Sequence, residues 1–78
     1  MHTIQYSTAS PVDPRDVQNI IHNNGGRITD NDGTEFLPVQ NGNGNSWFVC
    51  FLCDDQGQLD AILKQVINLL GNHFQGLT

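Results

Sequence analysis

The chain has 78 residues, with three basic side chains against eight acidic ones and a formal net charge of −5. This balance excludes direct binding to nucleic acid, because contact with the phosphate backbone needs clustered lysine and arginine. No stretch approaches the roughly 20 apolar residues that a membrane span needs, and the N-terminus has no signal-peptide pattern. Two cysteines are too few for a secreted disulfide framework. We therefore expect one cytoplasmic domain over residues 1–78.

The first 26 residues predict a strand followed by a helix. Residues 2–8 alternate between apolar and polar side chains, as a half-buried strand does. Asp13 is expected to cap a helix over 14–24, since Pro14 suits the first helical position and Gly25 a helix end. A narrow apolar stripe lies along this helix: Val17, Ile20 and Ile21. Such a stripe predicts that the helix lies on a sheet with most of its surface in water.

Residues 27–45 predict short, irregular strands. We expect a strand at 27–30, a tight turn at 31–33 and a returning strand at 34–40, and we count 27–40 as one bent hairpin arm. Pro38 has no backbone N–H, which places the returning strand at a sheet edge or a bulge. Alternating Asn and Gly residues at 40–45 predict a hairpin loop into the next strand.

The seven apolar residues at 47–53 predict the central strand of the domain. Side chains alternate in direction along a strand, so Trp47 points with Val49, and Phe48 points with Cys50. Both faces of this strand are apolar, which is typical of a central position in a sheet.

A long helix is expected to follow, capped by Asp55 with Gln58 in a capping box and ended by Gly71 in the left-handed conformation. Its apolar positions fall within about half the helix circumference: Leu59, Ile62, Leu63, Val66, Ile67, Leu69, Leu70 and Phe74. Residues 72–78 are expected to form either a frayed tail or a last short strand.

These elements predict a small two-layer α+β sandwich of order β-α-β-β-β-α. Its antiparallel-rich sheet has four strands, and both helices lie on one face of it. This order resembles a truncated ferredoxin-like or ACT-type sandwich whose last strand is missing or supplied by 72–78. The resemblance implies an architecture and no activity.

The residues that could carry chemistry have structural explanations. Cys50 and Cys53 have C-x-x-C spacing, but on a strand the two thiols face opposite sides, which favours two buried cysteines over a redox or metal pair. The three histidines are scattered singly, without the spacing of metal ligands. We therefore predict no enzyme activity, no cofactor and no metal site.

Two surfaces are candidates for binding. The first is a self-association face, which predicts a homodimer, because three or four large side chains would otherwise be open to water: Phe48, Cys50, Leu52 and Trp47. The second is an acidic rim that could bind a basic protein: Asp30, Asp32, Glu35, Asp54 and Asp55.

The leading hypothesis is a non-enzymatic protein-interaction module. It would act as an inhibitor or adaptor that occupies a partner's basic, nucleic-acid-binding surface, as phage-type inhibitors do. One alternative is an ACT-like regulatory domain that senses a small molecule at a dimer interface. A third hypothesis is a redox or metal protein based on the two cysteines.

Overall fold

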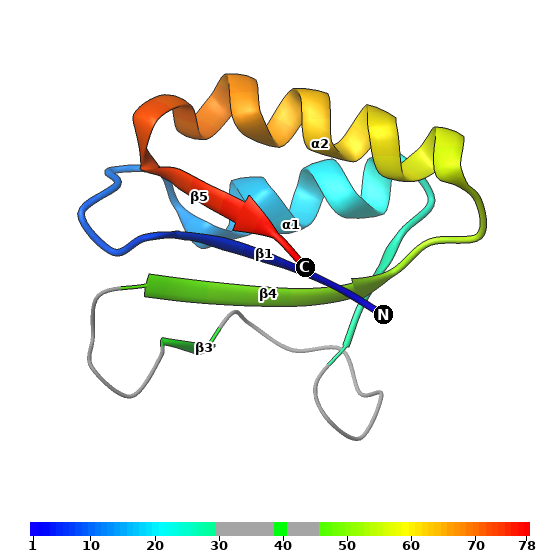
Figure 1. The fold of residues 1–78 in the computed structure, drawn as a ribbon, viewed down its shortest axis with the longest axis horizontal. Coiled ribbons are helices and arrows are strands. Elements are labelled where there is room, and N and C mark those ends of the chain that lie inside the picture. Colours follow the sequence, from blue (N-terminus) through cyan, green and yellow to red (C-terminus); the bar gives the residue numbers. More distant parts are fainter. Residues whose placement is uncertain (30–38, 41–45) are drawn as a thin grey trace.

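The computed structural model describes residues 1–29, 39–40 and 46–78, and it shows one sheet with two helices on a single face (Figure 1). In chain order the elements are β1 (His2–Ser7), α1 (Pro14–Asn23), β2 (Arg27–Ile28), β3 (Val39–Gln40), β4 (Ser46–Leu52), α2 (Gln56–Leu70), a 3₁₀ turn (Gly71–His73) and β5 (Phe74–Leu77). The predicted α+β sandwich and its antiparallel sheet are confirmed.

The strands follow the order β2-β4-β1-β5, with β3 also paired to β4, and every pairing is antiparallel. Because β1 occupies one edge of β4, β2 and β3 share the other edge. Arg27 pairs with Leu52 near one end of β4, and Val39 pairs with Phe48 nearer the other end. Strands β2 and β3 therefore pair with different parts of the same edge of β4. The turn predicted at 31–33 and most of the predicted arm at 27–40 lie outside the described residues.

Two interleaved β-α-β units build this sheet. Both β1 and β2 are antiparallel to β4, which lies between them, and both β4 and β5 are antiparallel to β1 in the same way. This arrangement is consistent with a ferredoxin-like sandwich to which the short β3 has been added. The tail of the chain supplies the last strand, since Phe74 pairs with Tyr6 and Leu77 with Ile4.

Helix α1 begins at the predicted Pro14 and ends at Asn23, one residue before the predicted end, with Asn24 as its C-cap. The Asp13 side chain accepts a hydrogen bond of 2.9 Å from the Arg15 backbone N–H, which caps the first turn. After the helix, Gly26 packs so closely that an added Cβ would lie 2.7 Å from Ile21 Cγ2 and 3.2 Å from Ile62 Cδ1. Only glycine lets the chain leave α1 this close to α2 and enter β2.

Helix α2 is capped at both ends. Asp55 Oδ1 accepts from the Gln58 backbone N–H at 2.9 Å, while Gln58 Oε1 accepts from the Asp54 N–H at 2.8 Å. In the predicted capping box, the Gln58 side chain would accept from the backbone N–H of the cap residue, Asp55. In the structure it accepts instead from the N–H of Asp54, one residue earlier. Gly71 ends the helix with the expected positive φ of 56°, but its ψ of −125° is not the left-handed helical value.

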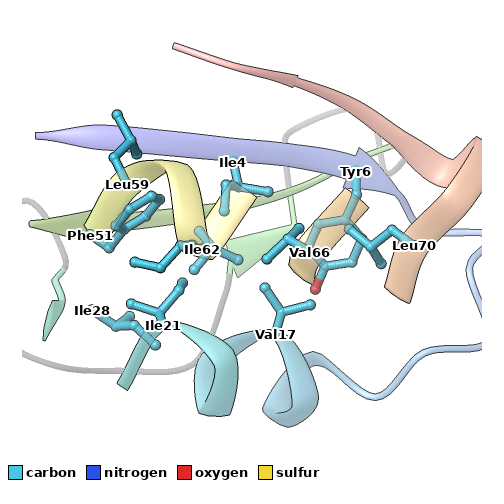
Figure 2. Close-up of a cluster of buried hydrophobic side chains, with 11 residues drawn as sticks. Ile4, Tyr6, Val17, Ile21, Ile28, Phe51, Leu59, Ile62, Val66 and Leu70 are labelled. Carbon is cyan, nitrogen blue, oxygen red and sulfur yellow. The ribbon is translucent and has the colours of Figure 1, made fainter. Parts of the chain in front are cut away.

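The core lies between the sheet and the two helices (Figure 2). It contains Ile4, Tyr6, Val17, Ile21, Ile28, Val49, Phe51, Leu59, Ile62, Val66 and Leu70. The buried stripe of α2 is narrower than predicted, because Ile67 and Leu69 are 45% and 37% exposed, and Phe74 belongs to β5. Within the described ranges, neither helix combines the length and apolar character needed to cross a membrane.

Candidate interaction surface

The sheet face opposite the helices carries the main candidate surface. Val49 and Phe51 of β4 are buried in the core, so strand alternation directs Phe48, Cys50 and Leu52 to the other face. All three are half-buried. We call this surface the open face and define it by eight residues, of which Ser46 is buried and Arg27 is exposed: Thr3, Gln5, Arg27, Ser46, Phe48, Cys50, Leu52 and Gln75.

Trp47 does not lie with the other residues predicted for self-association. It packs against the core on the helix side, two residues before Val49. The physical reason is the two-residue period of a strand, which separates Trp47 from Phe48. The other three predicted residues share the open face.

A chain of hydrogen bonds crosses the open face from one strand to the next. Gln5 Nε2 donates to Ser46 Oγ at 3.2 Å, and Ser46 Oγ donates to Gln75 Oε1 at 2.6 Å. Thr3 Oγ1 and Cys50 Sγ lie 3.5 Å apart beside this chain. The sequence predicts that Gln5 lies on the solvent-exposed face of its strand. It could not predict the hydrogen bonds to Ser46 and Gln75, because the three residues come from three different strands, β1, β4 and β5, and Gln75 lies at the bulge in β5.

The two free cysteines lie on opposite sides of the sheet. Cys50 is on the open face, whereas Cys53 packs against the core on the helix side. Burial raises the pKa of the Cys53 thiol, and the nearby Asp54 and Asp55 carboxylates raise it further. A raised pKa keeps the thiol protonated, which is the reverse of the environment that activates a cysteine nucleophile.

Among the described residues, the acidic side chains lie on or beside the helices rather than on the strands. Asp54 and Asp55 are exposed at the start of α2, where Asp55 serves as the cap. Three further carboxylates lie on α1, its cap or α2: Asp13, Asp16 and Asp60. The described strands contain no Asp or Glu, and their one charged side chain is that of Arg27. The other members of the predicted rim, Asp30, Asp32 and Glu35, lie outside the described residues.

Tyr6 brings a phenol into the core. Its side chain is fully buried and extends from β1 toward the helices (Figure 2). Among the described residues its hydroxyl has no hydrogen-bond partner. Burial raises the pKa of Tyr6 to about 12, with a further contribution from the Asp13 carboxylate.

The described residues offer no arrangement typical of a metal centre, since nowhere among them do three His, Cys, Asp or Glu side chains gather. The surfaces that remain are the open face and the acidic helix layer. Comparisons with models of protein families, with curated protein sequences and with solved structures found no match for this chain.

Proposed function

We propose that this protein is a non-enzymatic protein-interaction module that uses the open face as its contact surface. The observation that carries the proposal is the combination of half-buried apolar side chains with polar side chains that already bond to one another. Phe48 and Leu52 offer apolar area, while the Gln5, Ser46 and Gln75 side chains keep their partners when water leaves. Burying a surface of this kind costs little free energy, because the cost of burial comes mainly from polar groups that lose water and gain no hydrogen-bond partner.

The acidic helix layer supports a role as inhibitor or adaptor for a basic partner. The five described carboxylates lie on or beside the helices, away from the open face, and exposed charges of one sign speed encounter with a partner of the opposite sign. The two free thiols fit the reducing interior of a cell, where we expect the protein to act.

Paired variants test the role of the open face. Phe48→Glu places a charge on the open face, and Ile67→Glu places the same charge on the exposed surface of α2 as a matched control. Proteins captured from the native host by the wild-type chain are identified and then titrated with all three purified chains. We expect Phe48→Glu to weaken binding by at least about tenfold, as loss of a central apolar contact does, and Ile67→Glu to leave it unchanged.

Two outcomes would contradict the proposal. Equal binding by the wild-type chain and Phe48→Glu would show that the open face is not the contact. Weakening by Ile67→Glu alone would move the contact to α2. Circular dichroism of each variant checks that it is folded before its binding is compared.

A further inference from the structure

We infer that the pair Asn24 and Gly25 is a site of spontaneous covalent modification, the deamidation of Asn24, and that its rate is set by how often the end of α1 opens away from α2. The pair belongs to the corner of residues 24–26, which joins α1 to β2. The inference goes beyond the proposed function, because no part of it depends on the open face. It follows from the chemistry of the pair, from the hydrogen bonds that hold it, and from the effect of the product on the corner.

An asparagine followed by glycine holds the reacting groups of deamidation side by side. The Gly25 backbone nitrogen gives its proton to hydroxide and attacks Asn24 Cγ, the Cγ–Nδ2 bond breaks, and Nδ2 leaves as ammonia with a proton from water. Water then opens the succinimide ring, giving aspartate if the bond at Cγ breaks and isoaspartate if the bond at the backbone carbonyl carbon breaks. The net change exchanges water for ammonia, with no oxidation or reduction. Glycine has no Cβ to hinder the attacking nitrogen.

In the folded chain, both reacting groups are held in hydrogen bonds. Asn24 Nδ2 donates to the Ile20 carbonyl at 2.7 Å, which turns the side chain back along α1. The Gly25 N–H donates to the His22 carbonyl at 3.1 Å. Ring closure needs the Asn24 side chain turned toward Gly25 and the Gly25 nitrogen without its proton, so both bonds must break first. Deamidation therefore requires local opening of the end of α1.

Two glutamines of α2 hold the same pair from outside α1. Gln65 Nε2 donates to Asn24 Oδ1 at 3.2 Å, and a Cβ added at Gly25 would lie 2.7 Å from Gln58 Nε2. Asn24 is half-buried and Gly25 is exposed, so water already reaches the corner. The packing of α1 against α2, rather than access of water, is therefore what limits the reaction.

The product weakens the corner from which it forms. An aspartate at position 24 has no amide N–H for the Ile20 carbonyl, and it adds a carboxylate at the C-terminal end of α1, where the helix dipole disfavours negative charge. Isoaspartate also lengthens the backbone by one carbon beside Gly26. At Gly26 there is little room for a change, since an added Cβ would lie 2.7 Å from Ile21 Cγ2. Deamidation thus leaves a chain that opens more readily at this corner, which limits the lifetime of the fold.

Peptide mass spectrometry of the full chain tests the inference. The wild type, Gln65→Ala and Gln56→Ala are aged in mildly alkaline buffer with and without urea. Gln65→Ala removes the bond from α2 to Asn24, whereas Gln56→Ala is the matched control, because Gln56 bonds to Asp60 on the same helix. In the wild type, Asn24 should deamidate at least about tenfold more slowly without urea than in urea, which corresponds to a local opening free energy of about 1.4 kcal/mol.

Without urea, Gln65→Ala should deamidate about two- to fivefold faster than the wild type, as the loss of one hydrogen bond predicts, and Gln56→Ala should match the wild type. In urea all three chains should react at the same rate. Equal rates with and without urea overturn the inference, as does an Asn24 that stays intact in urea. Equal rates in folded Gln65→Ala and Gln56→Ala overturn the control by α2.

Asn24→Asp tests the effect of the product separately from its formation. This variant carries the aspartate product from the start, and it should melt about 4–8 °C below the wild type. A melting temperature equal to that of the wild type would overturn the claim that deamidation weakens the corner.

Discussion

Replacing Phe51 by alanine is expected to lower the free energy of unfolding by about 3–5 kcal/mol. Phe51 is fully buried on the helix side of β4, and its ring centroid lies 5.6 Å from that of His2. Truncation removes apolar contacts and leaves a cavity that the close-packed core cannot fill. Domains of this size have a total stability of roughly 4–12 kcal/mol, so a large part of it should be lost. Urea denaturation followed by circular dichroism measures the change.

Phe48→Ala is the matched control, since it removes the same side chain three residues earlier on the opposite face of β4. Phe48 is only half-buried in the single chain, so we expect a loss of about 1–2 kcal/mol, smaller than that of Phe51→Ala. Both variants are compared at low protein concentration, where self-association contributes least. Equal losses would mean that the open face is packed within one chain as tightly as the helix side, which would weaken the case for an external partner.

Tyr6→Phe is expected to raise the free energy of unfolding by about 1–3 kcal/mol at neutral pH. The Tyr6 hydroxyl is buried without a hydrogen-bond partner among the described residues. Folding therefore removes its hydrogen bonds to water, and the described residues supply none in exchange. Phenylalanine keeps the ring and its contacts while removing that cost. A destabilised Tyr6→Phe variant would show that the hydroxyl does have a partner in the folded protein, such as a buried water.

The same phenol makes stability depend on pH in alkaline solution. The pKa of Tyr6 is about 12 in the folded chain and about 10 when unfolded, so ionisation favours unfolding only above pH 10. Below pH 10 this ionisation does not lower the free energy of unfolding. As the pH rises to 12, it lowers the free energy of unfolding by about 3 kcal/mol. Tyr6 is the one tyrosine of the chain, so tyrosinate absorbance reports its ionisation directly. In Tyr6→Phe the part of the alkaline loss that comes from this residue should disappear.

Local signals in the sequence were enough to place both helices. Asp13 and Asp55 each accept a backbone hydrogen bond at the predicted cap, and Gly71 supplies the positive φ that ends α2. Strand alternation also predicted that Ile4 and Tyr6 point the same way, and both are buried. These features depend on residues close together in the chain, which is why the sequence alone could predict them.

Features that depend on distant partners were harder to predict. Strand β5 has four residues, including Gly76, and its strand conformation depends on pairing with β1 at the other end of the chain. Its sequence therefore allowed a frayed tail as well as a strand. Exposure of Ile67 likewise depends on how far the sheet and α1 reach around α2, which helical periodicity does not specify.

The candidate surface was predictable in part for the same reason. Alternation identified Phe48, Cys50 and Leu52 as one face and placed Trp47 on the other with Val49, so Trp47 did not belong in the predicted self-association face. The hydrogen-bond chain through Ser46 could not be predicted, because it requires the register between three strands. Because this register pairs the polar side chains beside the apolar stripe with one another, burying the surface costs little free energy.

The rate at which a thiol reagent labels Cys50 tests the use of the open face most directly. A Cys53→Ala background leaves Cys50 as the one thiol, half-buried at the middle of the open face. If a captured partner covers this face, labelling should slow several-fold when that partner is added, and Phe48→Glu should abolish that effect. A labelling rate that the partner does not change, in both the background chain and Phe48→Glu, would contradict the account.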